Sequence, residues 1–110
     1  MLVETNWQGK MAFTAGGDDG ITFNMDASAD VGGQGKGVTP MTALLGALSG
    51  CMSMDITAML RKYVENNQIT NMRMEADGTQ NEQHPRFFTD VAITFYVEGD
   101  VPGKRVWSAM

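Results

Sequence analysis

Cysteine is almost absent from this chain of 110 residues, because Cys51 is the only one. A single cysteine cannot form an internal disulfide, so nothing in the sequence indicates an oxidising compartment. No signal peptide opens the chain, where Glu4 comes before any apolar segment. The uncharged run 37–54 is shorter than the roughly 20 apolar residues of a membrane span. We therefore expect a cytoplasmic protein with no membrane partner.

Basic residues are also few, with eight Lys and Arg against thirteen Asp and Glu and a formal net charge of -5. They are scattered along the chain, whereas nucleic-acid binding needs clustered Lys and Arg that neutralise phosphates. The sequence therefore predicts no nucleic-acid partner.

Histidine is as rare as cysteine, because His84 is the only one. It stands directly before Pro85, so we expect it in a loop or at the edge of a strand. One Cys and one His without grouped carboxylates cannot make a structural zinc site. A phosphate loop needs Ser or Thr after its Gly-Lys pair, but here Gly37 follows Lys36. The glycine-rich stretch is therefore predicted to be a flexible connection, and neither a metal nor a cofactor is expected.

Apolar and polar residues alternate in two pairs of segments. Residues 11–15 and 21–25 flank the turn sequence GGDDG, and residues 72–77 and 91–98 flank a polar turn. Alternation with a period of two on both sides of a turn predicts a hairpin with one buried face. Residues 2–7 are a candidate for a further strand. Asp26, at the end of the first hairpin, is interpreted as a strand-end residue.

A long helix is predicted between the two hairpins. Thr39 suits the N-cap and Pro40 the first turn, and nothing breaks the helix before about Asn66. One broad face is apolar, and a stripe of small residues lies opposite its first half. A helix that is apolar nearly all round belongs at the centre of a domain or dimer. The apolar face consists of Leu44, Leu45, Leu48, Met52, Ile56, Met59, Leu60 and Tyr63, and the stripe of Ala43, Gly46, Ala47 and Gly50.

Hairpins around one central helix predict an α+β fold in a single domain, residues 1–110. The segment 101–110 predicts the beginning of another helix. The ten methionines are interpreted as adaptable core residues and not as a metal-binding strip.

Two interpretations of Cys51 remain open on the residues alone. A lone cysteine in an apolar helix can be an inert packing residue. A reactive Cys51 needs a cation that keeps it ionised, delivered by another part of the fold or by another subunit. The candidates are Lys10, Lys36 and Arg86.

The segment GVTPMTALLGALSGCMSMDITAMLRK resembles the signature helix of the OsmC/Ohr family, the relatives of osmotically inducible protein C, and is most similar to its broad OsmC-like branch. The flanking segments WQGKMAF and HPRFFTDVAITFYVEGD agree in order. The resemblance implies antiparallel hairpins around a long central helix in an intertwined homodimer, with active sites at the subunit interface. It also implies a peroxiredoxin-like activity in oxidative stress, the thiol-dependent reduction of organic hydroperoxides.

In that family the cysteine matched by Cys51 attacks the peroxide as a thiolate and becomes a sulfenic acid. The resemblance assigns Lys10 to the position of an arginine that steadies the thiolate, and Met41 to that of a glutamate. It places the second, resolving cysteine beyond residue 110, so the C-terminal helix with that cysteine is expected to be missing and an external thiol to regenerate Cys51. The alternative is a non-catalytic homodimeric module of the same fold that binds an apolar small ligand.

Overall fold

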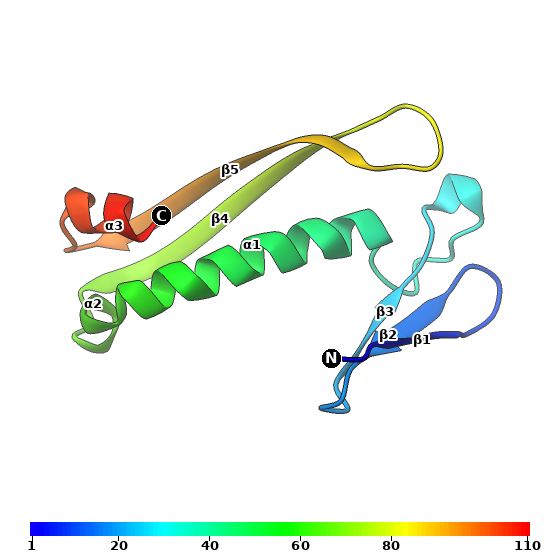
Figure 1. The fold of residues 1–110 in the computed structure, drawn as a ribbon, viewed down its shortest axis with the longest axis horizontal. Coiled ribbons are helices and arrows are strands. Elements are labelled where there is room, and N and C mark those ends of the chain that lie inside the picture. The colour runs from blue at the N-terminus through cyan, green and yellow to red at the C-terminus, as the bar shows by residue number, and fades with distance from the viewer. The chain divides into compact units, whose positions relative to one another are not determined.

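The predicted hairpins and helices all form, in the expected order (Figure 1). The structure is a computed structural model that describes residues 1–110. It contains antiparallel strands and a long central helix, so the α+β fold class is confirmed. The residues group into two compact units, Met1–Leu44 and Leu45–Met110.

The first unit is built on a three-stranded antiparallel sheet in the order β1-β2-β3. Its strands are β1 (Glu4–Trp7), β2 (Phe13–Gly16) and β3 (Thr22–Met25), so the candidate strand within residues 2–7 is confirmed. Trp7 lies opposite Phe13, and Phe13 lies opposite Met25. This row of large side chains therefore shares one face of the sheet, as the alternating pattern predicted.

The glycine-rich loop after β3 is held by one carboxylate, which corrects its interpretation as a flexible connection. Asp26 is buried, 3% exposed, and its side chain accepts hydrogen bonds from three backbone N–H groups. The donors are Ala27 at 2.8 Å, Gln34 at 2.9 Å and Lys36 at 3.2 Å. The loop also contains a short 3-10 helix, η1 (Ala29–Val31). Asp26 is thus the residue around which the loop folds, and not merely a strand end.

The long helix begins where predicted but ends early. Helix α1 spans Pro40–Met59, and the N–H of Thr42 donates to the hydroxyl of Thr39 at 3.3 Å, which confirms the N-cap. The chain then tightens at Leu60, whose carbonyl accepts the Tyr63 N–H at 2.9 Å, before a short helix α2 (Arg61–Glu65). The predicted continuous helix to about Asn66 is therefore wrong. At this interruption the side chains of Leu60 and Tyr63 both point into the core.

The second hairpin packs against this helical segment within the second unit. Strand β4 (Ile69–Gln80) pairs with β5 (Phe88–Gly99), and Met74 lies opposite Phe95. Helix α3 (Gly103–Ala109) follows, as expected from the last ten residues. The core of this unit consists of Ile56, Leu60 and Tyr63, with Ile69, Met74, Phe95, Val101, Val106 and Ala109 packed around them.

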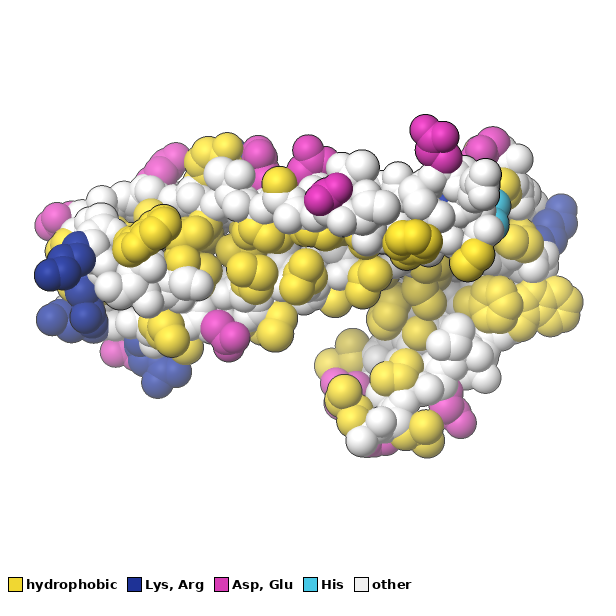
Figure 2. All heavy atoms as spheres, turned by 45° about the horizontal axis from the view of Figure 1, so that its top comes forward, with side chains coloured by type: hydrophobic (Ala, Val, Ile, Leu, Met, Phe, Trp, Pro, Cys, Tyr) yellow, Lys and Arg dark blue, Asp and Glu magenta, His cyan; other side chains and the backbone are white.

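Most of α1 is exposed in the single chain, so of the two expected places for this helix, the centre of a domain or of a dimer, the chain alone does not provide the first. Ile56 is its only buried residue. Leu44 is 56% and Leu48 43% exposed, and Met54 and Met59 are more exposed still. These two methionines are therefore not core residues. Hydrophobic side chains form a row along the flank of the second unit in Figure 2.

By length and composition alone, α1 would also suit a membrane-spanning helix. A core helix of a soluble protein passes the same test, so this property does not by itself indicate a membrane.

Candidate functional site

Cys51 lies in the middle of α1 as a free, exposed cysteine, and so is not a buried packing residue of this chain. Residues three and four positions apart share a helix face, which places Leu48, Met54 and Asp55 beside it. Asp55 is the only charged residue between Pro40 and Met59. The dipole of the helix fades within its first turn, so α1 itself supplies no positive charge for a thiolate.

Lys10 lies in the tight turn between β1 and β2, where its backbone adopts a left-handed conformation with φ of 49°. The turn is closed by the N–H of Ala12, which donates to the carbonyl of Gly9 at 3.0 Å. The carbonyl of Lys10 accepts a hydrogen bond from the indole N–H of Trp7 at 2.8 Å. The backbone of Lys10 is thus fixed, while its side chain extends into solvent. Lys10 belongs to the first unit and Cys51 to the second.

The other two candidate cations have local roles. Lys36 belongs to the glycine-rich loop, where its backbone N–H donates to Asp26. Arg86 lies in the loop between β4 and β5, and its guanidinium donates to the carbonyl of Asn81 at 2.6 Å. His84 is exposed in the same loop, as predicted. Neither Arg86 nor His84, which belong to the same unit as Cys51, forms a hydrogen bond with its thiol.

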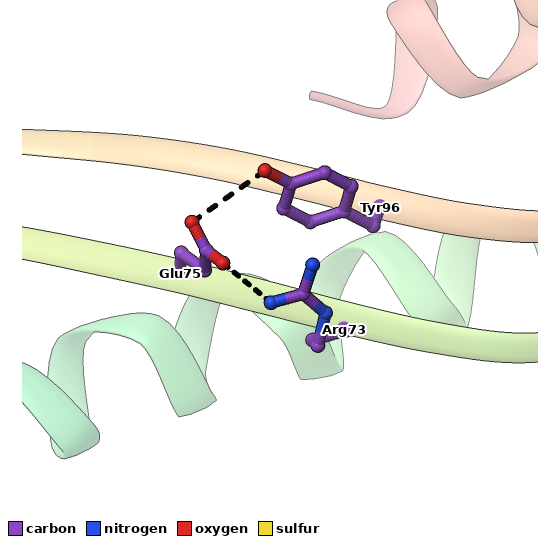
Figure 3. A network of polar contacts seen from close by, with 3 residues as sticks. All are labelled: Arg73, Glu75 and Tyr96. Carbon is purple, nitrogen blue, oxygen red and sulfur yellow. Dashed lines mark hydrogen bonds and ion pairs between the residues drawn. The ribbon is translucent and has the colours of Figure 1, made fainter.

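A polar network lies on the outer face of the second hairpin (Figure 3). The Arg73 guanidinium is paired with the carboxylate of Glu75 and lies 4.1 Å from the centre of the Tyr96 ring. The Tyr96 hydroxyl lies 3.5 Å from the second oxygen of Glu75. The hydrogen bond that the Arg73 guanidinium donates to the Glu75 carboxylate raises the pKa of Arg73. Because both charged side chains are more than half exposed, this network has the character of a surface ion pair and not of a buried catalytic group.

Asp26 is the charged residue whose role the sequence did not reveal. The backbone hydrogen bonds from Gln34 and then Lys36 lower the pKa of its carboxyl. The signal that could have found it is a carboxylate directly before a long glycine-rich loop, since such a loop has many backbone N–H groups to satisfy.

An apolar pocket of about 330 Å³ adjoins Asp26 in the first unit. Its walls include Met11, Phe13, Met25 and Pro40. The pocket is large enough for a small organic molecule. No three His, Cys, Asp or Glu side chains gather into a set that could hold a metal ion.

The profile of the OsmC-like protein family matches residues 33–110, more than half of the chain. Among solved structures, a hypothetical protein from Aquifex aeolicus VF5 has a TM-score of 0.78 at 20% identity, covering 98% of this chain and 74% of that one. A "putative osmotic stress induced and detoxification response protein" from Psychrobacter arcticus 273-4 has the same TM-score of 0.78 at 20% identity, covering 97% of this chain and 79% of that one.

A third solved structure, described only as structural genomics, is 24% identical with a TM-score of 0.78, and the match covers 99% of this chain and 77% of that one. No curated protein matches the chain. At these identities the similarity to solved structures shows a shared fold.

Proposed function

Because the chain belongs to the OsmC-like protein family, we propose that it reduces organic hydroperoxides with Cys51 as the reacting thiol. The observation that carries the proposal is the exposure of Cys51 on an apolar helix face. A hydroperoxide with an apolar body can approach such a face with its O–O group next to the sulfur. The description of the Psychrobacter arcticus structure as a stress and detoxification response protein supports the same role.

In the proposed reaction, the Cys51 thiolate attacks one peroxide oxygen and the O–O bond breaks. The sulfur becomes a sulfenic acid, and the other oxygen leaves as an alcohol after it takes up a proton. Cys51 is the only cysteine of the chain, so an external thiol condenses with the sulfenic acid to a mixed disulfide. A second molecule of that thiol then releases Cys51.

We propose that the protein acts as a homodimer. The chain buries only five hydrophobic side chains, whereas nineteen large hydrophobic residues are exposed. Monomeric soluble proteins rarely expose contiguous apolar patches, which usually mark interaction surfaces. The two sheets also have free outer edges, where strands of a second copy can pair. Sedimentation equilibrium should give twice the chain mass of 11.9 kDa, and a mass of one chain at micromolar concentration would refute the dimer.

The activity is tested by the consumption of cumene hydroperoxide with dithiothreitol as the reductant. We expect steady turnover for the native chain and no turnover above the uncatalysed rate for Cys51→Ser. The native chain should also gain one oxygen atom in its intact mass when the reductant is omitted, within the peptide that contains Cys51. Equal rates for the two proteins would remove the peroxidase proposal.

Lys10 is proposed as the cation that favours the thiolate. An opposite charge within a few ångströms raises the ionised fraction by about tenfold or more. We therefore expect Lys10→Met to lower the rate of Cys51 oxidation by about tenfold. Lys104→Met is the matched control, since Lys104 is an exposed lysine that is not one of the three candidate cations. Equal rates for both variants would show that Lys10 has no such role.

One observation favours the second candidate function, a non-catalytic module that binds an apolar ligand. The pocket beside Phe13 and Met25 is apolar and about 330 Å³ in volume. Titration with 1-anilinonaphthalene-8-sulfonate should then show saturable binding that Phe13→Ala abolishes and Cys51→Ser preserves. Saturable binding without peroxide turnover would favour this function.

A further inference from the structure

A second cavity of the first unit lies where its sheet meets the glycine-rich loop. Its volume is about 220 Å³. Gln8, Thr14 and Asn24 line it from the sheet and the turn after β1, and Lys36 lines it from the loop. The other lining residues are apolar, and no Asp or Glu is among them. The cavity thus combines neutral polar side chains with one positive charge.

The two strand residues of the cavity are oriented by a hydrogen bond between them. Thr14 lies opposite Asn24 in the register of β2 and β3, so their side chains share one face of the sheet. The hydroxyl of Thr14 donates to the side-chain oxygen of Asn24 at 2.8 Å. This hydrogen bond engages the oxygen of the amide, so Asn24 presents its NH2 group as a donor.

The loop that carries Lys36 is fixed against β3 on both sides of this residue. The N–H of Lys36 donates to Asp26 at 3.2 Å, and a Cβ at Gly37 would overlap the carbonyl group of Asn24. The N–H of Val38 donates to the carbonyl of Asn24 at 3.2 Å, and the carbonyl of Val38 accepts the N–H of Asp26 at 3.0 Å. The chain itself therefore occupies the edge of β3 here, and a strand of a second copy cannot pair at this point.

The only buried carboxylate of the chain does not compete for the cavity. Asp26 is not among the lining residues, and its oxygens accept hydrogen bonds from the backbone of Ala27, Gln34 and Lys36. The walls therefore offer N–H donors from Gln8 and Asn24 and the ammonium of Lys36. Hydrogen bonds between charged donors and oxyanions are about twice as strong as those between neutral groups.

We propose that this cavity binds a small oxyanion, the carboxylate or phosphate group of a small molecule, between the Lys36 ammonium and the side-chain amides of Gln8 and Asn24. The inference goes beyond the proposed peroxide reduction, because the site contains neither Cys51 nor any residue of α1. The chain has a formal net charge of -5, which disfavours unspecific binding of anions. Saturable binding of an anion therefore requires a local site.

The binding is measured by NMR on the full chain labelled with nitrogen-15. Sodium phosphate and sodium acetate are titrated separately at constant pH and ionic strength, with acetamide as the uncharged control. We expect saturable shifts of the side-chain NH2 signals of Gln8 and Asn24, with a Kd on the order of 1 mM. The salt that binds more tightly identifies the preferred oxyanion. Saturation by neither salt, or an equal response to acetamide, would overturn the proposal.

Three variants test the residues of the site. Lys36→Met should weaken binding by about tenfold or more, whereas Lys104→Met, which removes the same charge elsewhere, should change it less than about twofold. Asn24→Asp keeps the size of the side chain and its bond from Thr14 but replaces a donor with a negative charge, so it should abolish saturation. Circular dichroism checks that each variant is folded. Equal weakening by the two lysine variants, or unchanged binding by folded Asn24→Asp, would refute the site.

Discussion

Leu60 offers the sharpest test of how the second unit is stabilised. It is 1% exposed and lies in the core with Ile56 and Tyr63, where the helix tightens before α2. Burial of a leucine side chain contributes about 1.5–3 kcal/mol, and the cavity that remains raises the cost of Leu→Ala to about 3–5 kcal/mol. Because the core around Leu60 has only three buried residues, we expect Leu60→Ala to cost about 3 kcal/mol, near the lower limit.

Urea unfolding followed by circular dichroism measures this loss. With an m value of about 1.5 kcal/mol/M, the midpoint should fall by about 2 M urea. Leu44→Ala is the matched control, because it removes the same atoms from a side chain that is 56% exposed. Its cost should stay below about 0.5 kcal/mol in a single chain.

Equal losses for the two leucines would refute the reasoning, since burial would then not decide the cost. A third outcome would distinguish a monomer from a dimer. If Leu44→Ala lowers the midpoint more strongly at high protein concentration than at low concentration, Leu44 is buried between subunits, as expected for an interface residue of an obligate dimer.

Asp26→Asn should lower the free energy of unfolding at neutral pH, and the difference from the native chain should shrink below about pH 4. Folding lowers the pKa of Asp26, so its carboxylate stabilises the folded state fully at any pH above the pKa of the unfolded state. That stabilisation is lost as the pH falls through the pKa of the folded state. A difference in urea midpoints that does not change with pH would contradict this. Gly33→Ala should destabilise the glycine-rich loop, because a Cβ there would overlap the backbone carbonyl of Ala27, and an unchanged midpoint would show that the loop yields freely. Gly46→Ala should stabilise a single chain by about 1 kcal/mol, since a Cβ at Gly46 has no neighbour within 4 Å; a weakened dimer in sedimentation would instead place a partner helix against this residue.

Local patterns predicted the elements of the fold well. The alternation of residues 72–77 and 91–98 identified the second hairpin, although each strand extends several residues further. Thr39 and Pro40 fixed the start of α1, because capping depends only on the residues at the helix end. The family resemblance found Cys51, but the sequence pattern could not tell whether its side chain is exposed.

The errors come from properties that depend on tertiary contacts. The early end of α1 follows from the burial of Leu60 and Tyr63, and no glycine or proline marks it. The role of Asp26 depends on the loop returning to it eight and ten residues later, at Gln34 and Lys36. Helical periodicity shows which residues share a face but not which face has a neighbour.

The small residues of α1 connect this last point to the proposed dimer. A glycine within a helix costs about 1 kcal/mol relative to alanine, and α1 contains Gly46 and Gly50 in successive turns. Within the chain no contact offsets this cost, since nothing lies within 4 Å of a Cβ built at either residue. A close helix–helix contact is the arrangement in which glycine is favourable, because it lets two backbones approach. The glycines therefore have a physical purpose in a dimer that packs α1 against a second copy, and none in the isolated chain.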